Sequence, residues 1–309
     1  MFDISTTTIV ILVLLACLPA LAWTFVYRQL DKRDPEPYKA IAFSTFLGLV
    51  ATLPVFALQF FFTYFPDLNL VSLLQTTFNS TISFSLVFLI FVAVIEETVK
   101  AIAFIYAAQR FEHVFNQIVD GIIYAAAIGL GFALAENVYY FFRAYESFGY
   151  SSNFFAIFTI RSLGTMLAHT FFTGVFGFYF ARAYFAPFVD EGSKQERLWH
   201  NLGYNLSHAI RLHATFFHLL PAEKRESFNF SIKRNVMVLE GFIMAVFLHL
   251  VYNFLIKVEL FGQHFTFLIV PALFISAWYL WGRFFIPMYT RIVDFIRLRK
   301  SGEWRVRVH

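Results

Sequence analysis

The sequence predicts an all-α fold, a polytopic transmembrane bundle of about seven helices. Of the 309 residues, 59% are hydrophobic and only 14% are charged, whereas about 25% of residues are charged in a soluble domain. The mean hydropathy is +0.64, and no stretch is long and polar enough to form a water-soluble domain. Several apolar runs approach the roughly 20 residues that cross a bilayer as a helix. These runs are residues 5–27, 40–65, 83–109, 119–142, 155–183, 235–257 and 264–287.

The first run, 5–27, is expected to remain in the mature protein as an uncleaved span. The string LLAC ending at Cys17 resembles a lipoprotein cleavage box, but the segment before the run contains Asp3 and no lysine or arginine. A secretory signal has a basic segment there. The connection 28–39 carries four basic residues and two prolines, which stop a helix from running through. Residues 1–39 are therefore assigned to an N-terminal span and a basic juxtamembrane loop.

The remaining connections predict the orientation. Residues 184–234 and the tail 288–309 are rich in lysine and arginine, whereas 66–82 contains neither. Basic connections lie in the cytoplasm, which puts the N-terminus outside and the C-terminus inside. Residues 40–287 then form the bundle, and 184–234, which mixes aromatic, histidine and arginine residues, is expected to lie at the cytoplasmic surface. Because the basic residues flank spans, the net charge of +4 is not expected to bind nucleic acid.

Four of the runs carry ionisable side chains at the depth of the hydrocarbon. A carboxylate there costs about 2.5 kcal/mol or more, so such residues mark functional sites by default. At a rise of 1.5 Å per residue, all of them fall in the middle and outer half of the bilayer. They can therefore meet in one buried cavity. The residues are Glu96 and Glu97 in the third run, Glu136 in the fourth, His169 in the fifth and His249 in the sixth.

Within EETVK, Lys100 is spaced to reach both carboxylates, since Glu96 precedes it by four residues and Glu97 by three. Lys100 is thus expected to be a supporting residue that holds one glutamate ionised, while the other is left to titrate. A plain ion-pair lock between helices is the structural alternative.

Glu136 and the histidines stand beside positions that favour close helix packing. Ala127, Gly131 and Ala135 form a stripe of small residues that lets another helix approach Glu136. His249 is followed one turn later by Asn253, so the two point the same way. An imidazole acts as base, acid or metal ligand, and an amide can donate to an oxyanion. The alternatives are a packing seam and satisfied interhelical hydrogen bonds.

Three known catalytic motifs are absent from the sequence, which limits the mechanisms that its ionisable residues can support. The sequence contains no GxSxG serine motif, no YD/GxGD aspartyl pair and no HExxH zinc motif. Carboxylates with two histidines remain. Such a set activates water directly, with Glu96 or Glu97 as base, or through Zn²⁺ or another divalent metal, and both versions end in amide hydrolysis. For the metal version, the tentative ligands are Glu97, Glu136, His169 and His249, which are ordinary zinc ligands.

Several strings together resemble the motif set of the PrsW family of bacterial intramembrane proteases, in the family's order, over residues 28–258. They are DKRDPEP, EETVK, DGIIYAAAIGLGFALAENVYYF, HTFFTGVFGF and HLVYN. The resemblance implies a multi-pass protein of the bacterial plasma (inner) membrane that cleaves a membrane-embedded protein, of which a single-span anti-sigma factor is one candidate. It also implies that the active-site positions are Glu96, Glu97, Glu136, His169, His249 and Asn253. The oligomeric state is not specified.

Two other classes are weighed against a protease. A non-catalytic scaffold or receptor subunit, like the Aph-1 component of gamma-secretase, would use the same polar residues to order helices. A transporter would use them to relay protons, but it predicts discontinuous helices or an inverted repeat. No such repeat is visible between the two halves of the sequence.

Overall fold

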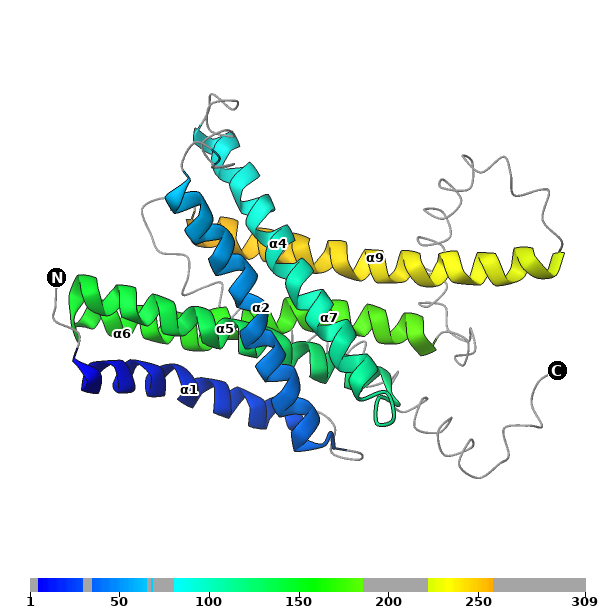
Figure 1. Ribbon diagram of the computed structural model, residues 1–309, viewed down its shortest axis with the longest axis horizontal. Coiled ribbons are helices and arrows are strands. Elements are labelled where there is room, and N and C mark those ends of the chain that lie inside the picture. The colour runs from blue at the N-terminus through cyan, green and yellow to red at the C-terminus, as the bar shows by residue number, and fades with distance from the viewer. Residues whose placement is uncertain (1–4, 30–34, 66–67, 69–80, 186–221, 258–309) are drawn as a thin grey trace.

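The computed structural model describes residues 5–29, 35–65, 68, 81–185 and 222–257, and in these ranges the regular structure is entirely helical. This confirms the predicted all-α fold for the described part of the chain (Figure 1). The elements are α1 (Thr6–Arg28), α2 (Tyr38–Tyr64), α4 (Thr81–Arg110), α5 (Ile118–Phe148), α6 (Ser152–Thr159), a π-helical turn (Ile160–Thr165), α7 (Met166–Phe185) and α9 (Ala222–Lys257).

Five stretches of the described chain are long and apolar enough to cross a membrane. They are α1, α2, α5, the continuous segment Ser152–Phe185 and the part of α9 from Arg234 to Ile256. The predicted run 83–109 coincides with α4, which carries three ionisable residues within its apolar length. The predicted run 264–287 and the tail 288–309 lie outside the described residues. The total of seven spans, the orientation and the division into three regions stay predictions.

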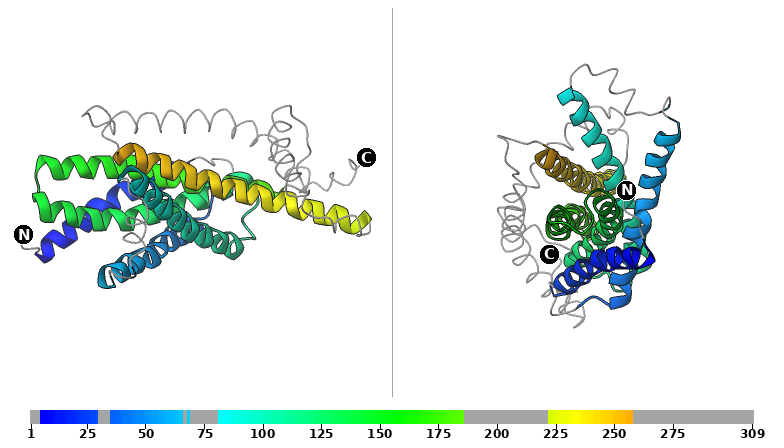
Figure 2. Two further views of the ribbon diagram at one scale, coloured as in Figure 1. Left: turned by 90° about the horizontal axis from the view of Figure 1, so that it is seen from above. Right: turned by 90° about the vertical axis from the view of Figure 1, so that its left-hand side faces the viewer.

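Helix α5 is the centre of the bundle. It packs against α7, α2, α1, α4 and α6, and its contact with α7 is the most extensive in the described structure. Viewed end-on, α5 and α7 lie at the centre, with α9, α4, α2 and α1 around them on three sides (Figure 2). Every residue of α5 from Ile118 to Ala133 is buried. The outer helices instead expose large apolar side chains such as Leu18, Leu21 and Phe25, as expected of a surface that faces lipid.

Small residues explain how the helices approach α5 so closely. A Cβ added at Gly131 would overlap the carbonyl oxygen of Thr45 on α2, and one at Gly48 of α2 would overlap that of Ile128. The backbones of α2 and α5 are therefore in direct contact, as is typical of membrane helices that meet at small residues. The predicted packing role of Gly131 is confirmed, and Ala127 is buried beside it.

The two later helices differ from the apolar runs that predict them. The run 155–183 is not one regular helix, because the π-helical turn separates α6 from α7. Helix α9 begins at Ala222, so residues 222–234, which the sequence analysis placed in the surface connection, continue the helix. Hydropathy detects only the apolar part of a helix, whereas charged residues such as those in AEKRES also favour helix. The rest of that connection, 186–221, lies outside the described residues.

A second buried polar cluster anchors the chain ahead of α2 to the start of α5. Glu36 is buried, and its Oε2 accepts a hydrogen bond from the hydroxyl of Tyr124. Asp120 is also fully buried, and its Oδ2 accepts hydrogen bonds from the backbone N–H groups of Asn116 (2.7 Å) and Gln117 (2.6 Å). The DKRDPEP string therefore contributes a carboxylate to the bundle interior, a role that the sequence analysis did not assign.

Candidate active site

The ionisable residues predicted from four separate runs meet at one place in the bundle. Glu96 and Glu97 come from α4, Glu136 from α5, His169 from α7 and His249 from α9. The two adjacent glutamates and both histidines are at most 5% exposed, and the side chain of Glu136 is 16% exposed. Hydrogen bonds and ion pairs join these five side chains and Lys100 in one cluster.

Lys100 lies at the centre of the cluster and is fully buried. Its Nζ is 2.8 Å from Oε1 of Glu97 and 2.8 Å from Nδ1 of His169. It is also 3.7 Å from Oε2 of Glu96 and 4.2 Å from the centre of the Phe132 ring. An ammonium group has donors only, so Nδ1 of His169 must accept. The predicted supporting contacts of Lys100 with both glutamates are present.

Each histidine has one nitrogen bound to a carboxylate; the other nitrogen contacts Lys100 in His169 and is directed toward Glu96 in His249. The N–H at Nε2 of His169 donates to Oε2 of Glu136 at 3.1 Å, which leaves the Nδ1 lone pair on the side of Lys100. Nδ1 of His249 donates to Oε1 of Glu97 at 2.8 Å, which leaves Nε2 3.7 Å from Oε2 of Glu96. A carboxylate behind a metal-binding histidine commonly fixes the ring and the tautomer in this way.

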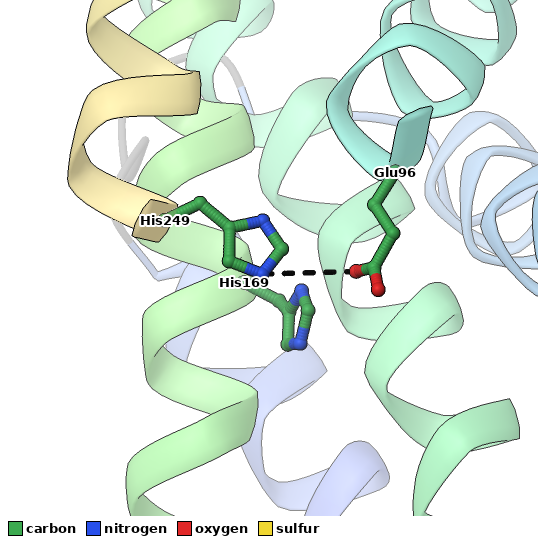
Figure 3. A group of neighbouring side chains, drawn as sticks. All are labelled: Glu96, His169 and His249. Carbon is green, nitrogen blue, oxygen red and sulfur yellow. Dashed lines mark ion pairs between the residues drawn. The ribbon is translucent and has the colours of Figure 1, made fainter. Parts of the chain in front are cut away.

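Glu96, His169 and His249 form a group that could hold a metal ion, because each offers one ligand atom and these atoms lie within 4.8 Å of one another (Figure 3). Oε2 of Glu96 is buried and makes no hydrogen bond within the described structure. Two imidazoles and a carboxylate oxygen without a hydrogen bond match the three protein ligands of a catalytic zinc site, in which water takes the fourth position. The tentative ligand set from the sequence named Glu97 and Glu136 in place of Glu96; here those two glutamates lie behind the histidines.

Aromatic rings enclose the two histidines. The His169 and His249 rings lie edge to face with their centres 5.1 Å apart, and Phe172 stacks on His249 at 5.4 Å. Phe132, which contacts the Lys100 ammonium, is also 5.6 Å from the His169 ring. Apolar walls of this kind keep lipid and bulk water away from charged groups and strengthen the interactions between them.

Asn253, which the sequence analysis placed in the site, is only half-buried and has no hydrogen bond to the cluster in the described part of the chain. Its neighbour Tyr252 is buried instead, with its hydroxyl 3.0 Å from Oγ1 of Thr165. A role for Asn253 at an oxyanion therefore stays a prediction.

Arg161 is a site residue that the sequence analysis missed. It lies in the π-helical turn, and its Nη2 donates to Oε2 of Glu136 at 3.2 Å. The available signal was an arginine inside the apolar run 155–183, the same signal that singled out the other ionisable residues.

A groove of about 590 Å³ lies between α4, α7 and α9, three of the helices that carry the cluster. Its wall starts at Ala101, the residue after Lys100, and continues along α4 to Gln109, while Phe242 and Arg234 line the α9 side. The other lining residues are Ile105, Phe176, Phe180, Ala183, Tyr184, Asn235, Val238 and Leu239. A mostly apolar groove of this size is within the range of ligand-binding clefts.

Comparison with known proteins connects this geometry to one family. Residues 36–230 match the family described as PrsW family intramembrane metalloprotease. The match includes the glutamates, Lys100, Arg161 and His169, but ends before His249, whereas the resemblance in the sequence extended over 28–258.

Individual relatives agree with the family match. The chain is 29% identical over 217 residues to Protease PrsW of Clostridioides difficile (strain 630), covering 69% of this chain and 81% of that protein. It is 27% identical over 168 residues to Protease PrsW of Bacillus subtilis (strain 168), covering 54% of this chain and 66% of that protein. No solved structure matches. With more than half of its length matched and its buried glutamates and histidines gathered in one place, the chain belongs to the PrsW family of membrane-bound peptidases.

Proposed function

We propose that this protein is a multi-pass intramembrane protease of the bacterial plasma membrane, and that Glu96 is the carboxylate at which water is activated. The observation that carries the proposal is the unused Oε2 of Glu96. Oε1 of Glu97 is engaged by Lys100 and His249, and Oε2 of Glu136 by Arg161 and His169. Oε2 of Glu96 is the buried carboxylate oxygen of the cluster without a hydrogen bond in the described structure.

The same geometry supports a divalent metal as the partner of that oxygen. Glu96, His169 and His249 would hold the ion, which would polarise the peptide carbonyl and acidify a water molecule. Formally, the three carboxylates of the cluster exceed its two permanent cations, Lys100 and Arg161, by one charge, so an added positive charge is favourable there. The metal description of the family agrees with this assignment.

The residues around the triad have distinct parts in the proposal. Glu97 holds His249 through Nδ1, which leaves Nε2 of that ring facing Glu96, and Glu136 holds the His169 ring through Nε2. Lys100 neutralises Glu97 and fixes it. Without a bound metal, Glu96 itself is placed to accept a proton from water, which is the role of a general base.

We further propose that the substrate is a membrane-embedded protein, with a single-span anti-sigma factor as the candidate class. A water-activating site inside the bundle serves a peptide bond at the same depth, and the groove between α4, α7 and α9 gives a peptide segment room between the helices that carry the cluster. The scaffold alternative is not favoured, because ordering helices does not require a buried carboxylate oxygen to be left without a hydrogen bond.

The test uses purified protein in liposomes with a single-span substrate, with and without a chelator, and measures cleavage and bound metal. Glu96→Gln is expected to abolish cleavage and to lose the metal, since the amide is a poor ligand and no base. Glu112→Gln, at an exposed glutamate two residues after the end of α4, is the control and should leave cleavage and bound metal unchanged. Cleavage by Glu96→Gln at the wild-type rate would overturn the proposal. Cleavage that resists chelation while Glu96→Gln is inactive selects the metal-free version.

A further inference from the structure

The π-helical turn Ile160–Thr165 places Arg161 beside the active-site cluster. A π-helical turn inside an α-helix is uncommon, and it is frequently found at functional sites. This turn is held from outside by side chains: Nε1 of Trp23 donates to the carbonyl of Ser162 at 3.1 Å, and Nδ2 of Asn137 donates to the carbonyl of Arg161 at 3.4 Å. Carbonyls of the turn thus have partners on α1 and α5, so the irregular backbone is fixed within the bundle.

The Arg161 side chain is bound in three ways to one face of α5. Its Nη2 donates to Oε2 of Glu136 at 3.2 Å, and its Nε donates to Oδ1 of Asn137 at 2.9 Å. The guanidinium carbon lies 3.7 Å from the centre of the Tyr140 ring. A planar guanidinium can make two directed hydrogen bonds and stack on an aromatic ring at once, whereas a lysine ammonium cannot. The side chain is 16% exposed, so it is largely removed from solvent.

Arg161 and His169 bind the same atom. Oε2 of Glu136 accepts from Nη2 of Arg161 and from Nε2 of His169. This oxygen accepts from Nε2 while Lys100 donates to Nδ1, so the two groups together fix the His169 ring and its tautomer. Among the described residues, the hydrogen-bond partner left to the glutamate without the arginine is the histidine, and the two side chains can then rotate together.

We propose that Arg161 is a positioning residue for the proposed hydrolysis: it fixes the Glu136 carboxylate, and through it holds the His169 ring beside Glu96 and His249. The inference rests on the proposed function, in which His169 is one of the groups around the proposed metal or activated water. Arg161 itself is not expected to contact substrate.

The test compares Arg161→Lys, which keeps the charge but loses the forked geometry, with wild type and with Arg143→Lys as the control. Arg143 lies on α5. Its side chain is 64% exposed, and it pairs with Glu146 at 3.1 Å. Arg161→Lys should lower kcat by about 10–100-fold, or Zn²⁺ affinity by a similar factor, as is usual when a partner behind a metal-binding histidine is removed. KM should stay within about twofold, since uniform substrate binding is not affected.

A double-mutant cycle separates positioning from a general loss of structure. If Arg161 acts through Glu136, Arg161→Lys should have little further effect on kcat in a Glu136→Gln background, because residues that act as a unit are not additive. A merely structural role predicts additive losses in kcat and in thermal stability. Additive losses, or an unchanged kcat and unchanged Zn²⁺ affinity in Arg161→Lys, would overturn the inference.

The outcome for Glu96→Gln distinguishes the two levels of the argument. If wild type cleaves and Glu96→Gln does not, the proposed function stands whatever Arg161→Lys does, and the arginine result decides the inference alone. If wild type neither cleaves a membrane substrate nor binds Zn²⁺, the proposed function fails and the inference is overturned with it.

Discussion

A single methyl group at Gly129 is expected to displace His169 without touching the chemistry directly. Gly129 lies on α5 directly behind the backbone of α7. A Cβ there would be 2.5 Å from the carbonyl oxygen of His169, 2.8 Å from its carbonyl carbon and 2.9 Å from Cα of Thr170. These are backbone atoms, so no side chain can rotate away. Ordinary contact begins at 3.4 Å, so the two helices must separate locally by about 0.9 Å.

That displacement is large compared with the hydrogen bond that orients the histidine. Nε2 of His169 is 3.1 Å from Oε2 of Glu136, and a shift of this size along the bond takes it past the limit of about 3.2 Å for a good N–H to O bond. Overpacking should lower stability by about 1–3 kcal/mol. Cleavage should fall by about 100-fold, the usual cost of misplacing a catalytic group by about 1 Å.

The assay measures kcat and the unfolding temperature of Gly129→Ala in the same detergent, with Gly174→Ala as the matched control. Gly174 is a buried glycine on α7, but the nearest atom to its Cβ would be Cγ2 of Ile122 at 3.6 Å, an ordinary contact. This variant should keep wild-type activity and be equally stable or slightly more stable. The reasoning is refuted if Gly129→Ala cleaves at the wild-type rate, or if Gly174→Ala is impaired to the same extent.

Two substitutions test the buried polar groups. Lys100→Met fills the same space but leaves Glu97 and His169 without the ammonium, so unfolding in detergent should become easier by about 3–5 kcal/mol, the cost of breaking a buried ion pair from one side; a variant as stable as wild type contradicts the central place given to this lysine. Tyr124→Phe removes the hydroxyl donor from Glu36 and should cost about 1–3 kcal/mol of stability. Because Tyr124 is three turns of α5 before Glu136, kcat should not change, and a large fall in kcat would connect the two polar clusters.

The fold was predictable where the chain contains long uninterrupted apolar runs. Run 119–142 falls within α5 (Ile118–Phe148), and 40–65 nearly matches α2 (Tyr38–Tyr64), because uninterrupted apolar length is a direct measure of membrane-crossing helix. The start of α9 at Ala222 was not predictable this way, since its first residues are charged and hydropathy does not register a polar helix. The π-helical turn at Ile160 depends on partners in α1 and α5, which no local pattern contains.

The sequence predicted most residues of the buried cluster, but not which of them contact one another. Glu96, Glu136 and His169 were found because a charged or polar side chain is costly in an apolar run. Glu96 and Glu97 are adjacent, about 100° apart on the helix, and sequence spacing cannot tell which of them Lys100 and His249 engage. Arg161 offered the same signal, a charge inside an apolar run, but its role is defined only by Glu136 on another helix, once the π-helical turn has packed against α5.

The second imidazole of the cluster, His249, comes from α9, the last described helix of the chain. Translation delivers both α4 glutamates, Glu136 and His169 before residue 186, yet His249 follows only after a long further stretch, and domains assemble as the chain emerges from its N-terminal end. A nascent or truncated chain that ends ahead of this last described helix therefore holds an incomplete constellation. If hydrolysis requires His249, as the proposed function holds, it begins only once α9 has joined the bundle.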